Sequence, residues 1–427
     1  MLDIKLIRKE REHIEKKIQK KEPGLTLGPL LELDQTIRNL KTEVEEYKAK
    51  RNALSKTIGN KKPQKESVDE MMAEVRKIGE KITALDHKLV ITEREFNDVL
   101  SRLPNVPADD VKVSQDKNDN VLIKTSGEKP HFSFTPKNHL ELNERLKLFD
   151  FHATAKTSGT GWPAYRGMGA RLEWALLSYM IDIQIMKGFE FWLPPLLVRP
   201  QVMFGSGQIP KFNGQFYQLK EESLDHELYL VPTAEVVLNG LHFEEILEAN
   251  KLPLCYSAYT PCFRREAGAA GTHERGLIRV HQFNKVEMFV FCTPENDQKM
   301  QDKMLVTAEE ILNGLGLHYR HMMLVTGDMS FTAAKTIDIE VWLPGQNAYY
   351  EVSSISNCTD YQARRSKIRY RDHEGKLNLV HTLNGSGLAT PRLLVSLLEN
   401  YQREDGSVDL PPVLAEKLGT HRLTPMT

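Results

Sequence analysis

Apolar residues in the first hundred positions follow the spacing of a coiled coil. Over residues 30–58 they recur at alternating intervals of three and four, and residues 68–103 repeat the pattern. This alternation gives each helix one apolar seam, as in left-handed coiled coils. A short polar connection with Gly59 and Pro63 separates the two series. The pattern predicts an antiparallel helical hairpin, which a short helix over residues 3–22 precedes.

The rest of the chain shows a different pattern. Helical spacing over 172–186 ends at Gly188, and a last helix is predicted over 391–402. Between them lie β-prone runs at 227–232, 257–266, 279–291, 337–343 and 348–356. Several runs are joined by hairpin-type turns, which favours an antiparallel sheet over alternating βαβ units. The predicted fold is α+β, with a helical hairpin in 1–103 and an antiparallel β-sheet domain flanked by helices in 104–427.

Composition separates the same two parts. Residues 1–103 hold 23 basic and 19 acidic residues, whereas residues 104–427 hold 34 basic and 39 acidic residues and all four Trp and all four Cys. The cysteines have no paired CxxC spacing, which argues against a zinc site or a disulfide framework and favours a reducing compartment. No run of 18 apolar residues and no signal-peptide core occurs. We expect a cytoplasmic protein without a membrane segment and without zinc.

Basic residues gather near the expected turn of the hairpin. They are Arg51, Lys56, Lys61, Lys62 and Lys65. A basic rod can bind a phosphate backbone, and the scarcity of aromatic residues favours shape recognition of folded RNA over base stacking. A dimerisation or scaffolding coil is an equally weighted alternative for such a hairpin.

The densest group of candidate site residues lies between 262 and 287. Neither a P-loop nor a Rossmann glycine motif occurs in the chain. Instead, one predicted strand carries Arg264 and Glu266 on one face, and a glycine-rich loop follows. Arg279 stands at the start of a second strand, which should present four further side chains on one face: His281, Phe283, Lys285 and Glu287. This set suits a compound with a phosphate, a base and an amine.

Two smaller groups contain oxygen ligands. Glu351 and Ser354 could hold Mg²⁺, but three-residue spacing places them on opposite faces of a regular strand, so joint ligation needs a bulge or a strand end. Thr233 and Glu235 stand at the end of another strand and carry little weight alone.

A third group combines small residues with a cation. The stretch from Asn384 to Ala389 is expected to lead into a helix with Thr390 as N-cap and Pro391 at its first position. Arg392 then lies in the first turn, where an anion would meet both its guanidinium and free backbone N–H groups.

In this order the groups resemble the class II aminoacyl-tRNA synthetases, and among them the seryl-tRNA synthetases. The segment that ends at Pro195 is similar to motif 1 of that class, residues 263–287 to motif 2 and residues 385–392 to motif 3. The similarity to the seryl branch also includes the N-terminal coiled coil and residues 205–212, 233–235, 281–287 and 351–357.

The helix over 171–187 carries apolar residues on more than one side, which predicts a homodimer formed through this helix and the strand that reaches Pro195. The resemblance implies a cytoplasmic enzyme that ligates serine to tRNA. L-serine and ATP with Mg²⁺ would give seryl-adenylate and pyrophosphate, and serine would then pass to the 3′ end of serine tRNA. Whether selenocysteine tRNA is a second acceptor stays open. The hairpin would bind tRNA through its basic residues.

The resemblance also implies roles for single residues. Arg264 would hold the α-phosphate, Glu266 would read the adenine amino group, Phe283 would stack on adenine, and Arg392 would bind the γ-phosphate; both arginines are assigned as catalytic. The ATP site comprises Arg264, Arg265, Glu266, Arg279, Val280, Phe283, Glu351, Val352, Ser353, Ser354 and Arg392, with Mg²⁺ at Glu351 and Ser354. The serine site comprises Thr233, Ala234, Glu235, Arg264, Glu287, Asn384 and Ser386.

Two other interpretations stay open at this point. One is a sister class II ligase, or a relative that activates an amino acid without charging tRNA, and the intact hairpin argues against the latter. The other is a coiled-coil scaffold with a degenerate ATP-binding domain. The joint presence of the two arginines with Glu266, Glu287 and Glu351 argues against a scaffold.

Overall fold

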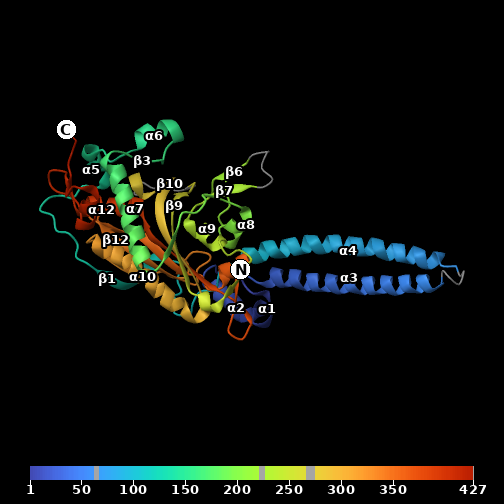
Figure 1. Cartoon of the computed structure of the whole chain (residues 1–427). Helices are drawn as coiled ribbons and strands as arrows, with labels where there is room; N and C mark the ends of the chain where they lie inside the picture. Colours follow the sequence, from blue (N-terminus) through green and yellow to red (C-terminus); the bar gives the residue numbers. More distant parts are fainter. Residues whose placement is uncertain (62–66, 221–226, 266–274, 427) are drawn as a thin grey trace. The chain divides into compact units, whose positions relative to one another are not determined.

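In the computed structural model the backbone divides into two units, Leu2–Leu103 and Pro104–Thr427, and Met1 groups with the second. The structure describes residues 1–61, 67–220, 227–265 and 275–426. The described part of the first unit is helical, and the second combines a large sheet with helices (Figure 1). The predicted α+β class is therefore confirmed. Among the described helices, none combines the length and the apolar character that a bilayer crossing requires.

The first unit contains four helices in its described residues: α1 (Ile4–Lys9), α2 (Arg11–Gln19), α3 (Gly28–Lys61) and α4 (Asp69–Ser101). The single helix predicted over residues 3–22 is wrong, because the chain leaves helical geometry at Glu10, with φ −127° and ψ 40°. On the two sides of this break, α1 buries Ile7 and α2 buries Ile14 and Ile18. The 34 residues of α3 span about 50 Å at 1.5 Å per residue.

Helices α3 and α4 run antiparallel, side by side, along the predicted seam (Figure 1). Every seam position from the sequence is buried or half-buried, whereas Val90 and Ile91, which lie outside the seam, are exposed. Ion pairs cross between the helices, from Lys41 to Glu93 at 2.7 Å and from Lys50 to Glu74 at 2.6 Å. Exposed ion pairs of this kind contribute little to the free energy of folding, so the hairpin is held together by burial of its apolar seam.

An eight-stranded sheet forms the centre of the second unit, in the order β1-β11-β12-β13-β16-β10-β9-β4. Seven of these strands pair antiparallel, and only the edge strand β4 pairs parallel, with β9. Their bounds are β1 (Val121–Ser126), β4 (Glu190–Trp192), β9 (Leu254–Phe263), β10 (Gln282–Cys292), β11 (Tyr319–Met323), β12 (Lys335–Leu343), β13 (Ala348–Asn357) and β16 (His381–Ala389).

Strand β16 corrects the sequence prediction. The residues of Asn384–Ala389 were expected only to lead into a helix, and no strand was predicted there, but they pair with β13 and β10 in the middle of the sheet. Glycine suits this strand because a Cβ on Gly385 would lie 2.7 Å from Ile355, and one on Gly387 would lie 2.4 Å from Gln184. Close packing against neighbouring elements, rather than turn formation, explains these glycines.

One face of the sheet is covered by α7 (Met168–Met186), α10 (Asp297–Gly314) and α12 (Thr390–Asn400), which share one apolar core with it. The sequence predicted α7 and α12 closely. The other face carries α9 (Ala234–Gly240) and α11 (Tyr361–Ser366), which bury a smaller cluster. The remaining α-helices are α5 (His139–Leu146), α6 (Phe151–Ser158), α8 (Pro200–Gly205) and α13 (Pro412–Leu418).

Four small sheets complete the described part of this unit. Their strands are β2 (Phe149–Asp150), β3 (Ala164–Tyr165), β5 (Leu197–Val198), β6 (Gln218–Leu219), β7 (Leu228–Leu230), β8 (Ile246–Glu248), β14 (Arg369–Arg371), β15 (Leu377–Leu379), β17 (Val408–Asp409) and β18 (Arg422–Leu423). Strand β7 lies within the run predicted at 227–232.

Candidate functional site

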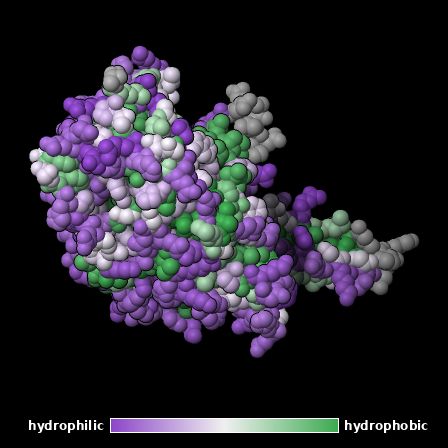
Figure 2. Space-filling view, turned by 60° about the vertical axis from the view of Figure 1, so that its left-hand side comes forward, coloured by the Kyte–Doolittle hydropathy of each residue, from purple (hydrophilic) through white to green (hydrophobic). Residues whose placement is uncertain are grey.

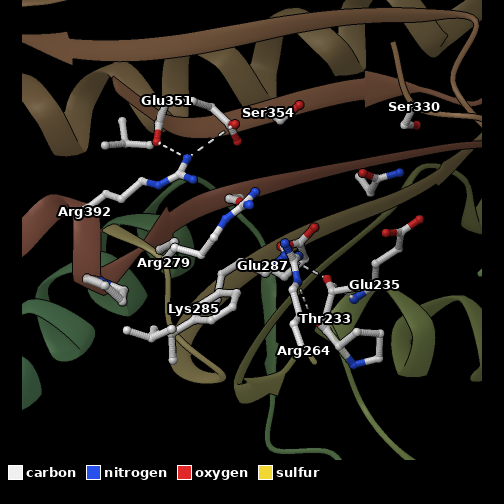
Figure 3. A pocket seen from close by; sticks show the side chains of 18 of the residues that line it. Thr233, Glu235, Arg264, Arg279, Lys285, Glu287, Ser330, Glu351, Ser354 and Arg392 are labelled. Carbon is white, nitrogen blue, oxygen red and sulfur yellow. Dashed lines mark hydrogen bonds and ion pairs between the residues drawn. The ribbon is translucent and has the colours of Figure 1, made fainter. Parts of the chain in front are cut away.

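A polar cavity of about 700 Å³ opens on the face of the large sheet that α7 and α10 leave uncovered (Figure 3). It gathers side chains from β10, β13 and β16, from the start of α12 and from the segment before α9. Thirteen residues of the predicted ATP and serine sites line it: Thr233, Glu235, Arg264, Arg279, Val280, Phe283, Glu287, Glu351, Val352, Ser354, Asn384, Ser386 and Arg392.

The two faces of β10 separate the core from the cavity. Because side chains alternate along a strand, Val286, Met288 and Val290 enter the apolar core under α7, while Phe283, Lys285 and Glu287 line the cavity. His281, which the sequence placed with the latter set, precedes the strand and stacks on Trp162 at 5.4 Å between ring centroids. It is therefore not part of the cavity wall.

A bulge in β13 brings Glu351 and Ser354 to the same cavity. Ser353 pairs with Ile339 and Glu351 pairs with Glu340, so Val352 is the extra residue between them. An extra residue shifts the alternation by one position, and side chains three apart can then share a side. The bulge that joint ligation requires is thus present.

Arg392 reaches the cavity from the start of α12, where the predicted cap is wrong. Thr390 is the first helical residue and not the N-cap, because its hydroxyl bonds to the Asn284 carbonyl at 3.1 Å and to the Glu173 carboxylate. The Arg392 Nη1 donates to the Glu351 carbonyl at 2.8 Å and lies 3.4 Å from the Glu351 carboxylate (Figure 3). Both contacts aim the guanidinium into the cavity.

Arg264 follows β9, which ends at Phe263, three residues before the end of the run predicted at 257–266. Its guanidinium lies 5.1 Å from the centroid of the Phe283 ring, and its Nε donates to the Pro232 carbonyl at 3.3 Å. Arg265 is exposed and does not line the cavity. Glu266 lies outside the described residues.

The deep end of the cavity contains three charged side chains that are nearly buried: Glu235, Lys285 and Glu287. The Lys285 ammonium lies 2.5 Å from the Glu287 carboxylate and donates to the Thr233 hydroxyl at 2.7 Å. The Glu235 carboxylate accepts from the Gln362 amide at 2.6 Å. Burial, and secondarily repulsion by Glu287, raises the pKa of Glu235 to about 7. This end can hold a small molecule with an amine and a hydroxyl group.

Some predicted site residues do not line the cavity. Ala234 is fully buried in α9, and the Ser353 hydroxyl turns away to donate to the Ser386 carbonyl. In the hairpin, Lys56 is exposed and Arg51 is half-buried at its seam position, while Lys61 is half-buried at the end of α3. Lys62 and Lys65 lie outside the described residues.

Sequence reasoning missed part of the cavity wall. These residues are Gln208, Phe212, Gln215, Phe216, Pro232, Leu277, Ile278, Ser330, Thr332, Ser356, Ala389 and Pro391. All of them are uncharged, and several lie inside the segments that resemble the family motifs. No charge or periodicity distinguished them as site residues within or outside those segments. The sequence did identify Lys285, because the two-residue alternation places it on the face of the strand that lines the cavity. No role was assigned to it.

The environment of Glu351 suits a hard cation. Burial, and secondarily the nearby Glu351 carboxylate, raises the pKa of Asp338 well above its usual range, and its Oδ1 is buried without a hydrogen-bond partner. Asp338 pairs across the strands with Ser354. Within the described ranges, no three His, Cys, Asp or Glu side chains form a ready metal cage. A cation here therefore needs ligands from a phosphate compound, as Mg²⁺ commonly does.

Comparison with known proteins covers both units. Residues 1–107 match the seryl-tRNA synthetase N-terminal domain, and residues 217–401 match the class II tRNA synthetase core domain of the glycine, histidine, proline, serine and threonine enzymes. The serine–tRNA ligase of Chlamydia abortus is 57% identical, with 97% of each chain covered. That of Chlamydia trachomatis is 58% identical, with 97% of this chain and 96% of the relative covered.

Solved structures give the same relationship. The seryl-tRNA synthetase of Pyrococcus horikoshii, complexed with ATP, superposes with a TM-score of 0.91 at 38% identity over the whole of both chains. The cytoplasmic serine–tRNA ligase of Naegleria fowleri, in complex with AMP, gives a TM-score of 0.86 at 27% identity over 100% of this chain and 99% of the other.

A buried carboxyl group on α7 connects two walls of the cavity from behind. The Glu173 carboxylate accepts from the Asn284 amide at 2.9 Å and from the Thr390 hydroxyl, which belong to β10 and α12. Burial raises the pKa of Glu173 to about 7, although both hydrogen bonds favour the charged form. Its second oxygen is buried without a hydrogen-bond partner. Ionisation of Glu173 in the folded state is therefore costly.

We predict that Glu173→Gln flattens the pH dependence of stability. A folded-state pKa above the unfolded value means that stability is fully present at low pH and is lost as the pH rises through 7. The amide keeps one acceptor oxygen and never ionises. We compare the free energies of unfolding in denaturant of the variant and the parent chain. From pH 5 to pH 8.5 the difference should change by roughly 2–3 kcal/mol in favour of the variant. Glu374→Gln, at an exposed position, is the control; an equal effect at both pH values would contradict the prediction.

Proposed function

The chain belongs to the seryl-tRNA synthetase family as an ATP-dependent serine–tRNA ligase, and we propose that the cavity on its large sheet holds both substrates of the activation step. One observation carries this proposal. The same cavity is lined by three arginines and a buried ion pair: Arg264, Arg279, Arg392 and Lys285 with Glu287. A triphosphate and a small amino acid can therefore lie in it together.

The reaction needs little covalent chemistry from the protein. A serine carboxylate oxygen bonds to the α-phosphorus of ATP, the bond from that phosphorus to the β-phosphate oxygen breaks, and pyrophosphate leaves. A ribose hydroxyl at the tRNA 3′ end then attacks the seryl carbonyl carbon, and AMP leaves. Such transfers depend on positioning and charge stabilisation, and no enzyme nucleophile is required.

The arginines supply the positive charge for the triphosphate. Arg264 holds the α-phosphate, Arg279 assists, and Arg392 binds the γ-phosphate and the departing pyrophosphate. Phe283 stacks on adenine, while Glu266 reads its amino group. The Glu351 contacts support this assignment because they hold Arg392 in place before ATP arrives.

Serine is bound at the deep end of the cavity. Thr233, Glu287 and Ser386 contact it, and Glu235 and Asn384 lie close by. The burial of Thr233 and Glu287 supports this assignment. Alanine would leave the partners of the serine hydroxyl unpaired, and unpaired buried polar groups penalise the wrong substrate strongly.

Glu351 and Ser354 would hold Mg²⁺ together with the phosphates. The shared cavity side and the crowding of carboxyl groups near Asp338 support this site. When bound, the ion neutralises phosphate charge as pyrophosphate leaves.

We predict that Arg392→Ala loses 10²- to 10³-fold in serine-dependent ATP–pyrophosphate exchange, because one preorganised charge contact to the transition state is commonly worth that much. Thr233→Val is the matched comparison: it keeps the shape, removes a hydroxyl at the serine end, and should raise the KM for serine with little change in the KM for ATP. Near-normal exchange by a folded Arg392→Ala would remove Arg392 from the reaction.

The hairpin of α3 and α4 binds the tRNA substrate in this proposal. Its seam is self-contained, and Lys56 near the turn is exposed. None of the residues assigned to ATP or serine lies in 1–103, so the hairpin serves the second step and not activation.

Reversal of Lys56, Lys61, Lys62 and Lys65 to Glu should weaken tRNA binding and flatten its salt dependence, since each lost phosphate contact removes roughly 0.9 from the slope for a duplex. Pyrophosphate exchange should be unchanged. The same reversal at Lys117, Lys156, Lys299 and Lys376, which are exposed on the other unit, controls for net charge. Normal tRNA charging by the hairpin variant would make the hairpin a scaffold instead.

A homodimer completes the proposal. Large apolar side chains stand exposed on α7 and after β4, with Trp174 at 62%, Met186 at 69% and Leu193 at 74% exposure. Figure 2 shows hydrophobic surface, in green, between the hydrophilic residues of one face. Exposed apolar groups of this size commonly mark an interface. None of the four cysteines forms a disulfide bond in the described residues, which suits the reducing cytoplasm we propose as its location.

We predict that the chain sediments at twice its mass of 48.8 kDa and that Met186→Asp with Leu193→Asp halves this value, because two charges would be buried at the interface. Val306→Asp changes an exposed apolar residue on α10 and should leave the mass unchanged. A monomeric parent chain at micromolar concentration would exclude the homodimer.

A further inference from the structure

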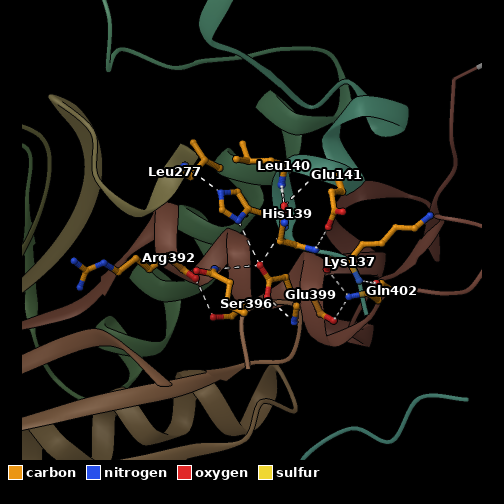
Figure 4. Close-up of polar contacts among 12 residues, drawn as sticks. Lys137, His139, Leu140, Glu141, Leu277, Arg392, Ser396, Glu399 and Gln402 are labelled. Carbon is orange, nitrogen blue, oxygen red and sulfur yellow. Dashed lines mark hydrogen bonds and ion pairs between the residues drawn. The ribbon is translucent and has the colours of Figure 1, made fainter. Parts of the chain in front are cut away.

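A buried imidazole outside the cavity contacts the segment that forms one of its walls. His139 is the first residue of α5 and is 2% exposed. Its Nε2 accepts a hydrogen bond from the backbone N–H of Leu277 at 3.3 Å, and its Nδ1 lies 3.4 Å from the Glu399 carboxylate (Figure 4). No substrate role is assigned above to either side chain.

These contacts determine where the imidazole carries its proton. A nitrogen that accepts from an N–H group cannot itself be protonated, so Nε2 is the free nitrogen and the proton is on Nδ1. That proton faces the carboxylate of Glu399. His139 therefore binds Leu277 as an acceptor, in a ring orientation that Glu399 favours.

Glu399 is itself fixed from several directions. It is fully buried on α12 and accepts from the His139 N–H at 3.1 Å, the Gly345 N–H at 3.0 Å and the Gln346 amide at 3.3 Å. These donors belong to two segments far from α12 in the sequence, one at His139 and one at residues 345–346. The orientation of the imidazole is therefore determined by the fold.

The segment that His139 holds reaches the cations of the cavity. Leu277 and Ile278 line the cavity, and the Ile278 carbonyl accepts from the Arg392 Nε at 3.4 Å. Arg279 is the next residue. Gly276 has φ +67°, and a Cβ there would lie 2.3 Å from the His139 Nε2, so the backbone packs directly onto the imidazole.

We propose that His139 is a positioning residue for ATP, which acts through the Leu277–Arg279 segment on Arg392 and Arg279, with Glu399 as the group that orients it. This inference rests on the proposed role of those arginines at the triphosphate. Loss of the Leu277 hydrogen bond would release the Ile278 carbonyl and the start of β10, and both arginines would lose part of their preorganisation.

Two amide substitutions separate the two hydrogen bonds of the imidazole. In His139→Gln the amide oxygen can occupy the place of Nε2 and accept from Leu277. In His139→Asn the amide nitrogen can occupy the place of Nδ1 and donate to Glu399, but the acceptor for Leu277 is lost. A purely structural role, as the buried partner of Glu399, would make Asn the milder change.

We expect His139→Asn to raise the KM for ATP in pyrophosphate exchange, and the Kd for ATP alone by calorimetry, about tenfold. The KM for serine should stay within twofold, and His139→Gln should restore ATP binding to within about threefold of the parent chain. Gln402→Ala is the matched control, because Gln402 bonds the Lys137 backbone and the Glu399 carbonyl in the same network without contact to Leu277. It should lower the melting temperature and leave the Kd for ATP unchanged.

Three results would overturn the inference. The first is a Kd for ATP in His139→Asn equal to that of the parent chain. The others are a higher Kd for ATP in His139→Gln than in His139→Asn, or an equal rise in the Kd for ATP in Gln402→Ala and His139→Asn. A parent chain that binds ATP but exchanges with an amino acid other than serine would contradict the proposed function and leave these three comparisons valid. A parent chain that does not bind ATP would overturn both.

Discussion

The site depends on strand β10 having two different faces. Its even-numbered residues from Val286 onwards fill the core under α7, and the odd-numbered residues from Phe283 to Glu287 line the cavity. A shift of one residue in the pairing with β9 would place Lys285 and Glu287 in the apolar core, at a cost of several kcal/mol for each charge. The apolar core therefore fixes the register of the strand, and this register places the polar groups.

Charges in the cavity are paired before any substrate arrives. Lys285 lies against Glu287, and Arg392 lies against Glu351. Each pair costs less to hold in a poorly solvated place than its members would alone, and each keeps a side chain in one position. A triphosphate and an amine thus meet groups that are already oriented, so little of the binding free energy is spent on ordering them.

The sequence predicted the parts of the molecule that have a period or an ordered set of charges. The hairpin seam, α7 and the strands around Glu287 and Glu351 follow from three–four or two-residue spacing. The β16 strand was missed because its glycines, which allow close packing, look like a turn. The helix cap at Thr390 was wrong because its hydroxyl is used by a distant residue, Glu173. Leu277 and Ile278 lie inside the segment that resembles motif 2, but they were missed as site residues because they carry no charge. The sequence indicated that Glu351 and Ser354 could act together only if the strand had a bulge or ended there, but it did not show that the bulge lies at Val352.

The position of Arg392 shows how the fold accepts a local cost at this site. A cation in the first turn of a helix opposes the helix dipole, so at this place Arg392 is unfavourable for α12 by itself. The Glu351 carboxylate and carbonyl offset part of that cost, and an anion in the cavity would offset the rest, because it would meet both the guanidinium and the positive end of the helix. Binding of a phosphate compound would then stabilise the folded chain at the start of α12, where the cation opposes the helix dipole. Because Arg392 lies in the first turn, its guanidinium is far from the carbonyl groups at the end of its own helix. It can therefore bind the leaving pyrophosphate.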